Sequence, residues 1–297
     1  MAARRSARAA DRWMAYGFML PAAVLVGVLM YWPMIDTFRE SLYSTSFIDP
    51  TPRFIGLSTY WAMFADGEFW QIVRNSCVWT IGVVALQNLG GFLVALLLNQ
   101  RLPGQGLLRS LILLPWVLPG VVAAILWRFM YDPQLGLINS ILMRLGIDGG
   151  GGWLADPSTA MAAAIVAAFW KGFPFSAVIF LAALQGVDHE QIESAKIDGA
   201  GSLRRLFDVV LPAISPIIRL NILLTSILTF NYFDMIYVLT RGGPLNATAI
   251  FPTRIYELGF GEFRFGEAAA YGSVAVLVLV LFVSVLSLVQ KRRPREA

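Results

Sequence analysis

The sequence holds few charged residues and almost no cysteine or histidine. Lys, Arg, Asp and Glu make up 14% of the 297 residues, while 57% of the residues are hydrophobic. A soluble domain carries about a quarter charged residues, so this composition excludes an ordinary soluble protein. The single histidine, His189, and the single cysteine, Cys77, cannot form a His/Cys metal cluster, a disulfide or a pair of haem ligands. We therefore expect no metal site built by this chain.

The sparse charges also exclude two classes of function. The sequence shows no cluster of His, Asp and Glu within or near its apolar stretches. It therefore argues against a membrane enzyme and predicts no catalytic residue. The net charge is +4, but the basic residues are divided between widely spaced loops and the two ends of the chain. We expect no nucleic-acid partner.

Long hydrophobic runs dominate what is present, and the mean hydropathy is +0.66. A helix needs about 20 apolar residues to cross the hydrocarbon core of a bilayer. Six runs reach that length, at about residues 14–34, 72–99, 110–130, 159–184, 214–239 and 268–289. The sequence thus predicts an all-α integral membrane protein with six transmembrane helices. It also predicts a single transmembrane domain over residues 14–290, between basic ends at 1–13 and 291–297.

The distribution of Lys and Arg sets the expected orientation of the chain. If the N-terminus is cytoplasmic, the inner side holds 13 Lys and Arg residues outside the spans and the longer outer loops hold 8. Cytoplasmic loops carry the excess of positive charge in membrane proteins. We therefore expect both termini to be cytoplasmic, together with the polar stretch that separates the fourth and fifth runs.

That stretch, about residues 188–203, is named the elbow here. Ile192, Ala195 and Gly199 recur at helical spacing, which predicts a short helix with one small, smooth side. Gly199 and Gly201 are expected to end this helix. A second short segment with apolar residues at 203, 207 and 210 is expected next, and Pro212 is expected to open the following helix.

The elbow resembles a known signature. Glu193-Ser194-Ala195, followed by Asp198-Gly199-Ala200-Gly201 and then Leu211-Pro212, looks like the EAA loop of permease subunits of bacterial ABC importers, with Ser194 in place of an alanine. The resemblance implies a coupling helix that sits in a groove of the cytoplasmic ATPase. It assigns the ATPase contact to Glu193, Ser194, Ala195, Asp198, Gly199, Ala200 and Gly201. An ordinary amphipathic linker between two spans is the competing interpretation.

Further stretches are similar to permeases of carbohydrate ABC importers of the maltose and glycerol-phosphate type. They include Leu114-Pro115, Gly136-Leu137-Ile138-Asn139 and the run Phe233 to Pro244. The resemblance implies a type I ABC importer permease fold in the bacterial inner membrane, and a non-catalytic subunit that binds no cofactor itself. It also implies a heterodimer with a second, homologous permease. The other implied partners are two ATP-binding cassette subunits that bind ATP and Mg, and an extracytoplasmic solute-binding protein.

The same resemblance implies a pathway for a sugar-type substrate. Its candidate lining residues are Lys171, Gly172, Phe175, Leu228, Thr229, Asn231 and Tyr232. Lys171 lies about 18 Å into its span, at 1.5 Å per residue, and a cation at that depth is usually functional. One hypothesis is that Lys171 reads an anionic group on the sugar, such as a phosphate, sulfonate or carboxylate. The alternatives are pairing with a neighbouring subunit or wetting by the cavity. For Asp234 we expect a structural role in pairing or capping.

These inferences predict a subunit that forms half of the translocation pathway of an ATP-driven importer. Pro115, Pro119 and Pro174 are either bend points or static kinks, because proline interrupts the helical hydrogen-bond ladder. The alternative function is an ion-driven secondary transporter of a small polar solute. That class normally shows inverted repeats and broken helices with polar residues at the midplane, which this sequence does not display.

Overall fold

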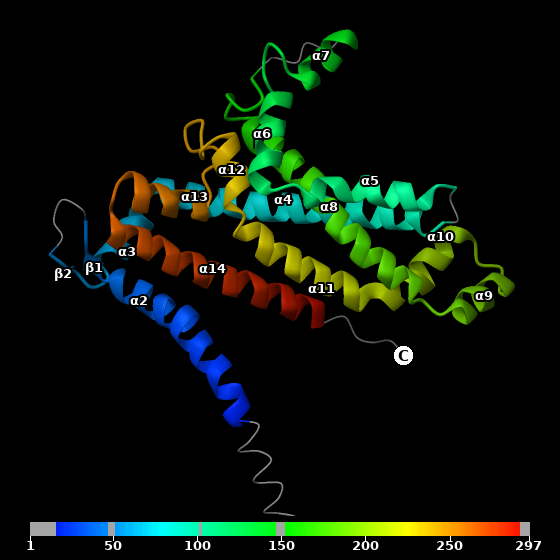
Figure 1. Cartoon of the computed structure of the whole chain (residues 1–297), viewed down its shortest axis with the longest axis horizontal. Coiled ribbons are helices and arrows are strands. Elements are labelled where there is room, and N and C mark those ends of the chain that lie inside the picture. Colours follow the sequence, from blue (N-terminus) through cyan, green and yellow to red (C-terminus); the bar gives the residue numbers. More distant parts are fainter. Residues whose placement is uncertain (1–15, 47–50, 101–102, 147–151, 292–297) are drawn as a thin grey trace, which may run out of the picture. The chain divides into compact units, whose positions relative to one another are not determined.

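The structure is a computed structural model that describes residues 16–46, 51–100, 103–146 and 152–291. The predicted basic ends therefore lie outside the described residues, apart from Lys291, at which the last helix ends. The elements in Figure 1 are almost all helices. Contacts divide the chain into two units, Met1–Ala65 with Ile255–Val274 and Asp66–Arg254 with Ala275–Ala297.

The first unit is organised by a long helix and a small hairpin. Its elements are η1 (Gly27–Tyr31) and α2 (Trp32–Glu40) within the helix Tyr16–Glu40, β1 (Tyr43–Ser44), β2 (Arg53–Phe54), α3 (Ser58–Ala65), η3 (Glu257–Gly261) and the start of α14 (Phe265–Lys291). The strands are antiparallel, with Tyr43 opposite Phe54. The hydroxyl groups of Ser41 and Tyr60 lie 2.6 Å apart and tie α3 to the hairpin region.

The second unit contains most of the helices and both predicted sites. Its elements are α4 (Gly67–Leu98), α5 (Gln105–Val117), α6 (Gly120–Met130), α7 (Leu137–Arg144), α8 (Ala160–Gln185), α9 (His189–Ile197), α10 (Ser202–Arg205), η2 (Leu206–Val210), α11 (Leu211–Phe230), α12 (Phe233–Leu239), α13 (Phe251–Tyr256), which extends just past the boundary, and the end of α14.

Within the described residues, five helices are long and apolar enough to cross a membrane, and a bent pair can form a sixth span. The five are Tyr16–Glu40, Gly67–Leu98, Ala160–Gln185, Ser202–Phe230 and Phe265–Leu288. The pair is α5 and α6, which meet at 95°. Pro119 precedes α6 at this bend, as the sequence predicts for an interruption there, whereas Pro115 and Pro174 lie inside continuous helices.

One prediction about the fifth span is wrong. The span does not continue to Leu239, because α11 ends at Phe230 and α12 begins separately at Phe233. Pro212 lies in the first turn of α11, as predicted, although α10, η2 and α11 together form one span from Ser202 to Phe230. The π-helical turn η2 lies directly before Pro212, with Leu211 N–H donating to Leu206 O. This wider turn carries the helix past the N–H that proline lacks.

The core of the second unit is the contact between α4 and α8, which lie along one another in Figure 1. A Cβ at Gly91 would stand 2.6 Å from Ser176 Cβ and 2.9 Å from the backbone nitrogen of Ala177. Only glycine permits this approach, so Gly91 is a point of close packing between the two helices. Nearer the N-terminal ends of both helices, a Cβ at Gly82 would touch Ile165. The contacts advance in the same direction on both helices, so α4 and α8 run parallel.

Candidate functional site

The elbow begins with a capped helix of nine residues. Asp188 is the N-cap of α9 and its side chain accepts a hydrogen bond from Glu190 N–H at 2.9 Å. A carboxylate in this place accepts a hydrogen bond from a backbone N–H that has no partner within the helix. Its negative charge also interacts favourably with the positive N-terminal end of the helix. This cap fixes where the chain leaves α8 and starts the elbow.

The end of α9 is equally well defined. Gly199 has a φ of +79°, its N–H donates to Lys196 O at 3.0 Å, and Ala200 N–H donates to Ala195 O at 2.9 Å. This pair of bonds is a Schellman motif, which needs a left-handed residue where glycine has no steric penalty. The guanidinium of Arg205 then donates to Ala200 O at 2.9 Å. The turn at the predicted glycine end of the helix is therefore held by backbone and side-chain hydrogen bonds.

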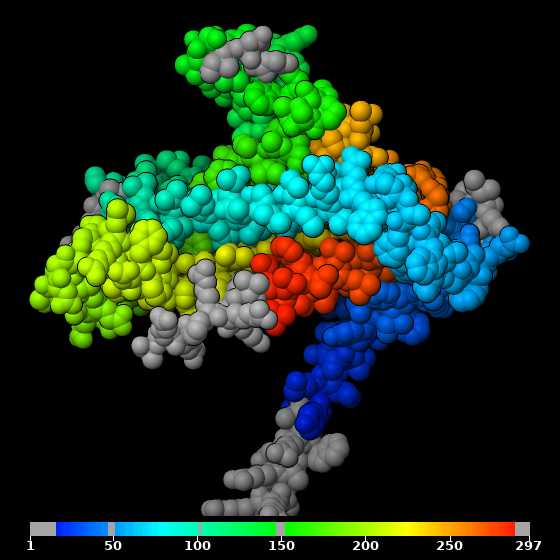
Figure 2. All heavy atoms as spheres, turned by 180° about the vertical axis from the view of Figure 1, so that it is seen from behind, coloured from blue at the N-terminus to red at the C-terminus, as the bar shows by residue number. Residues whose placement is uncertain are grey.

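A hydrophobic cluster fixes the elbow to the helix bundle. The half-buried side chains of Ile192 and Val210 pack against a cluster that contains Leu98 at the end of α4 and Leu184 at the end of α8. In Figure 2 the elbow, in yellow-green, projects as a lobe beside the end of the cyan helix α4. The elbow is thus an outward projection whose inner side belongs to the core.

The predicted coupling residues lie mostly on the outer side of this lobe. Glu193, Ser194, Asp198, Gly199 and Gly201 are exposed, while Ala195 and Ala200 are half-buried. A Cβ added to Gly199 or Gly201 would meet no atom within 4 Å. The bend therefore presents a small, open surface that a second protein can approach closely.

A pocket of about 410 Å³ brings together most of the predicted pathway residues. Six of the seven candidates line it, namely Lys171, Gly172, Phe175, Leu228, Thr229 and Tyr232. Asn231 does not line it. Its side chain is exposed and donates to Ile227 O at 2.9 Å, within its own helix. Leu228 and Tyr232 face the same pocket even though the helix ends between them, at Phe230.

Five other residues, which sequence reasoning did not connect to the pathway, also line the pocket. They are Gln87 on α4, Trp116 on α5, Gly120 on α6, Thr225 on α11 and Asp234 on α12. A polar glutamine in the middle of an apolar run is a signal that could have identified Gln87. Trp116 and Gly120 flank the bend between α5 and α6, and only the fold shows that this bend opens onto the pocket.

The pocket combines stacked rings with hydrogen-bonding groups. The rings of Trp116 and Phe175 stack with centroids 6.0 Å apart and an interplanar angle of 28°. Gln87 Nε2 donates to Ala168 O at 3.2 Å, and a Cβ at Gly172 would stand 1.8 Å from this nitrogen. A side chain at position 172 would therefore displace the amide group of Gln87. A flat apolar face beside a few polar groups is the usual form of a small-molecule site.

A buried polar network supports the pocket from behind. Asn221 is fully buried, and its Nδ2 donates to Asn88 Oδ1 at 2.8 Å and to Ser176 Oγ at 3.0 Å. Asn88 Nδ2 in turn donates to Thr225 Oγ1 at 3.2 Å. These residues belong to α4, α8 and α11, so hydrogen bonds between side chains join the three helices that carry much of the pocket wall.

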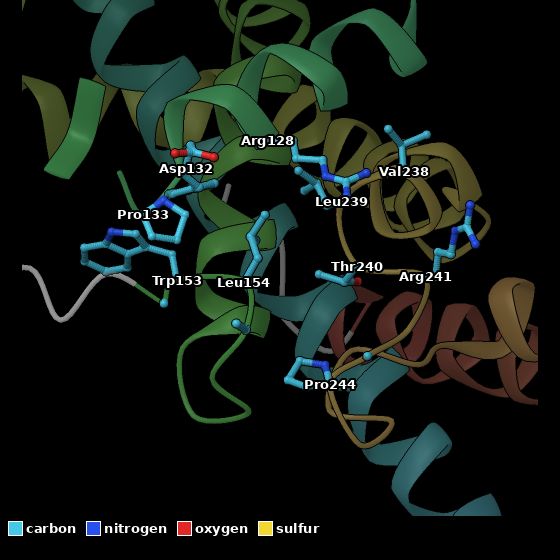
Figure 3. Close-up of a pocket in the computed structure, with 14 residues that line it drawn as sticks. Arg128, Asp132, Pro133, Trp153, Leu154, Val238, Leu239, Thr240, Arg241 and Pro244 are labelled. Atoms are coloured by element: carbon cyan, nitrogen blue, oxygen red, sulfur yellow. The ribbon is translucent and has the colours of Figure 1, made fainter. Parts of the chain in front are cut away.

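A second recess, of about 510 Å³, lies in the same unit and contains none of the predicted site residues. Figure 3 shows Trp153 and Pro133 on one side of it and Val238 and Arg241 on the other. Its Gly152–Ala155 wall directly precedes α8, whereas the elbow directly follows α8. At 1.5 Å per residue, this 26-residue helix separates the recess from the elbow by about 39 Å.

The loop beside this recess is held by carboxylate caps. Asp132 Oδ1 accepts hydrogen bonds from Leu135 N–H at 2.8 Å and from Gln134 N–H at 2.9 Å. These two donors hold the pKa of the Asp132 carboxyl below its ordinary value. Trp153 Nε1 donates to Asn139 Oδ1 at 2.7 Å and fixes the indole. Among the described residues, no group of three or more His, Cys, Asp and Glu could hold a metal ion.

Comparisons with known proteins agree on one family. The profile described as "Binding-protein-dependent transport system inner membrane component" matches residues 87–295. The trehalose/maltose transport system permease protein MalF of Thermococcus litoralis is 35% identical over 269 residues, covering 91% of this chain and 90% of that protein. The sn-glycerol-3-phosphate transport system permease protein UgpA of Yersinia pestis bv. Antiqua is 32% identical over 281 residues, covering 92% of each chain.

A solved structure gives the same fold. One chain of a bacterial ABC transporter involved in the import of the acidic polysaccharide alginate superposes with a TM-score of 0.83, over 98% of this chain and 100% of that one, at 22% identity. The predicted fold class is confirmed by this likeness, and the rival ion-driven transporter is not favoured. The chain belongs to the binding-protein-dependent transport system inner membrane components, as a multi-pass, non-catalytic permease subunit of the sugar ABC importer type.

Proposed function

We propose that this chain forms one half of the translocation pathway for a sugar or sugar derivative and couples that pathway to a cytoplasmic ATPase through the elbow. The observation that carries the proposal is the convergence of six predicted pathway residues on one pocket. The relatives' names support a sugar-type substrate, because they refer to trehalose, maltose and sn-glycerol 3-phosphate. The stacked Trp116 and Phe175 offer the flat face on which a pyranose ring packs.

The other half of the pathway comes from a second, homologous permease. Leu228 is 62% exposed and Trp116 is 48% exposed, although both line the pocket. An apolar wall that is open on one side of a single subunit suits closure by a neighbouring subunit. We therefore propose a heterodimer of permeases with the pocket at its interface.

In this proposal the elbow contacts the cytoplasmic ATPase. Two ATP-binding cassette subunits, which bind ATP and Mg, would receive α9 with Glu193 as a carboxylate for a basic partner. Both termini and the elbow lie on the cytoplasmic side in this arrangement. An extracytoplasmic solute-binding protein would dock at the other end of α8, where the recess offers Arg128, Trp153 and Arg241.

The test is charge reversal on α9. The chain is tagged and purified with its transport system after Glu193→Arg, and the bound ATPase subunit and the rate of ATP hydrolysis are measured. We expect loss of most of the ATPase subunit, with the second permease retained. Glu190→Arg is the matched control, because Glu190 is an exposed carboxylate on the same helix outside the signature, and we expect it to retain the ATPase. Equal retention by both variants, or no ATPase with the unaltered chain, would refute the proposed coupling.

A further inference from the structure

The pocket holds a second charged side chain opposite to Lys171 in sign. Among the residues that line it, Lys171 and Asp234 are the cation and the carboxylate. The sequence hypothesis has Lys171 read an anionic group on the sugar and assigns Asp234 to pairing or capping. In the structure Asp234 interacts electrostatically with Lys171, and no capping bond is made at the start of α12. Both charges therefore belong to the pocket.

The side chain of Asp234 lies at the start of a neighbouring helix. Its Oδ2 lies 2.9 Å from the point where a Cβ on Gly120 would stand, so the carboxylate lies against the first residue of α6. The N-terminus of a helix carries a partial positive charge, which favours a nearby carboxylate. Gly120 makes this approach possible because a side chain there would collide with the carboxylate.

A hydroxyl without a partner stands beside this carboxylate. Tyr232 Oη lies 3.4 Å from the same Cβ position on Gly120. In the described part of the chain this buried oxygen has no hydrogen-bond partner. An unpaired buried polar group costs free energy, so the wall of the pocket offers Tyr232 Oη to a ligand next to Asp234.

The two charges are not joined to each other. Within the described residues, no ion pair connects Lys171 with Asp234, although both line the pocket. The space between them thus has a donor-only ammonium on one wall and an acceptor-only carboxylate on another. A sugar hydroxyl both donates and accepts, so an uncharged saccharide can satisfy both walls. A phosphate or carboxylate on the ligand would satisfy Lys171 and be repelled by Asp234.

We propose that Asp234 is a specificity-determining residue that balances Lys171 and makes the pathway select an uncharged saccharide over an anionic one. This inference rests on the proposed function and narrows its substrate class. It replaces the hypothesis that Lys171 reads an anionic group by a pair of opposite charges that share one uncharged ligand.

Direct binding to the purified transporter tests the inference. The complex of both permeases with the ATPase subunits, without the solute-binding protein, is placed in nanodiscs and titrated while tryptophan fluorescence is followed. The uncharged probes are trehalose and maltose, and the anionic probes are trehalose 6-phosphate and sn-glycerol 3-phosphate. Trp116→Phe identifies the part of the signal that comes from the pocket, since Trp116 lines it.

We expect the unaltered complex to bind an uncharged probe more tightly than either anionic probe. Asp234→Asn should strengthen binding of trehalose 6-phosphate relative to trehalose by about tenfold or more, since one like-charge repulsion is removed. Lys171→Met should weaken the anionic probes further. The double variant Lys171→Met with Asp234→Asn should return the ratio toward that of the unaltered complex, because the pocket is again neutral.

Tighter binding of an anionic probe by the unaltered complex would overturn the inference, and so would an unchanged ratio in Asp234→Asn. If Asp234→Asn fails to assemble, the ratio in Lys171→Met decides in its place, and no loss of anionic binding there overturns the inference. If none of the four probes binds while the ATPase still co-purifies and hydrolyses ATP, the sugar pathway itself is refuted and this inference with it. Coupling through the elbow would stand in that case.

Discussion

The elbow takes its form from one uninterrupted stretch, in which Asp188 begins α9 and Gly199 ends it. The pocket, by contrast, collects side chains from α4, α5, α6, α8, α11 and α12. The elbow is therefore set by local caps and turns, whereas the pocket is set by the distances between helices. We therefore expect substitutions that disturb helix packing to affect the pocket first. Substitutions in the bend of the elbow should leave the pocket intact.

The largest effect is expected where two helices touch most closely. Gly91→Ala places a methyl group 2.6 Å from Ser176 Cβ and 2.9 Å from Ala177 N, so α4 and α8 must separate. We expect a loss of about 1–3 kcal/mol or more in stability, measured as a lower midpoint of thermal unfolding of the detergent-solubilised complex. The control is Gly106→Ala on α5, where an added Cβ meets nothing within 4 Å. If both variants unfold at the same temperature, close packing does not determine the pocket.

The next effect concerns the network behind the pocket. Asn221→Ala removes the donor shared by Asn88 and Ser176, and hydrogen bonds between helices in a bilayer contribute about 1–2 kcal/mol. We expect a lower unfolding midpoint and weaker sugar binding with normal ATPase attachment. Asn231→Ala serves as the control, because the exposed Asn231 side chain donates locally to Ile227 O and does not join two helices among the described residues. Loss of the ATPase subunit in Asn221→Ala would show that the two regions are not independent.

At the elbow the expected loss of stability is smaller. The property that changes is binding of the ATPase, whereas sugar binding is unaffected. Gly199→Ala forces a non-glycine residue to a φ of +79°, at a cost of about 1 kcal/mol. We expect weaker binding of the ATPase subunit and lower ATP hydrolysis, while sugar binding remains normal. Gly201→Ala is the matched control, since Gly201 has a φ of −64° and equally open surroundings. Equal ATPase binding in the two variants would contradict a role for the bend.

The smallest effect is an acid dependence in the loop at the far end of α8. Because the pKa of Asp132 is lowered in the folded chain, its contribution to stability is present above its unfolded pKa of about 3.9 and is lost as pH falls through the lower, folded value. Asp132→Ala should speed hydrogen exchange of the 134–135 amides at pH 6, and its difference from the unaltered chain should shrink as pH falls below about 3.9. Gln134→Ala should leave the Leu135 amide unchanged over the same range. A difference that does not shrink with acid would contradict the cap.

These differences also explain how far the sequence could be interpreted. Glu193 to Gly201 is contiguous, so its helix, its glycine end and its resemblance to the EAA loop could be recognised without the fold. The six spans followed from hydropathy, because apolar length alone decides whether a helix can cross a bilayer. The roles assigned to Glu193 and its neighbours remain predictions that the charge-reversal experiment tests.

The pocket could be predicted only in part. Lys171, Phe175 and Tyr232 were identified from a resemblance, but the sequence does not reveal which other helices face them. Gln87 is visible as a polar residue in an apolar run, yet its place beside Gly172 depends on the packing of α4 against α8. The end of the fifth span at Phe230 was missed, since hydropathy continues across the break at residues 231–232. That break turns Asp234 into the pocket.

The anchoring of Ile192 has a mechanical consequence. Ile192 packs against the cluster that contains Leu98 and Leu184, and these two residues lie at the ends of parallel helices that also carry the pocket residues Gln87 and Phe175. At 1.5 Å per residue, Leu98 lies about 17 Å from Gln87 along α4, and Leu184 lies about 14 Å from Phe175 along α8. We expect a force on the elbow to reach two walls of the pocket over nearly equal distances. Those two walls are then expected to move together, so that the pocket widens or narrows against its other sides.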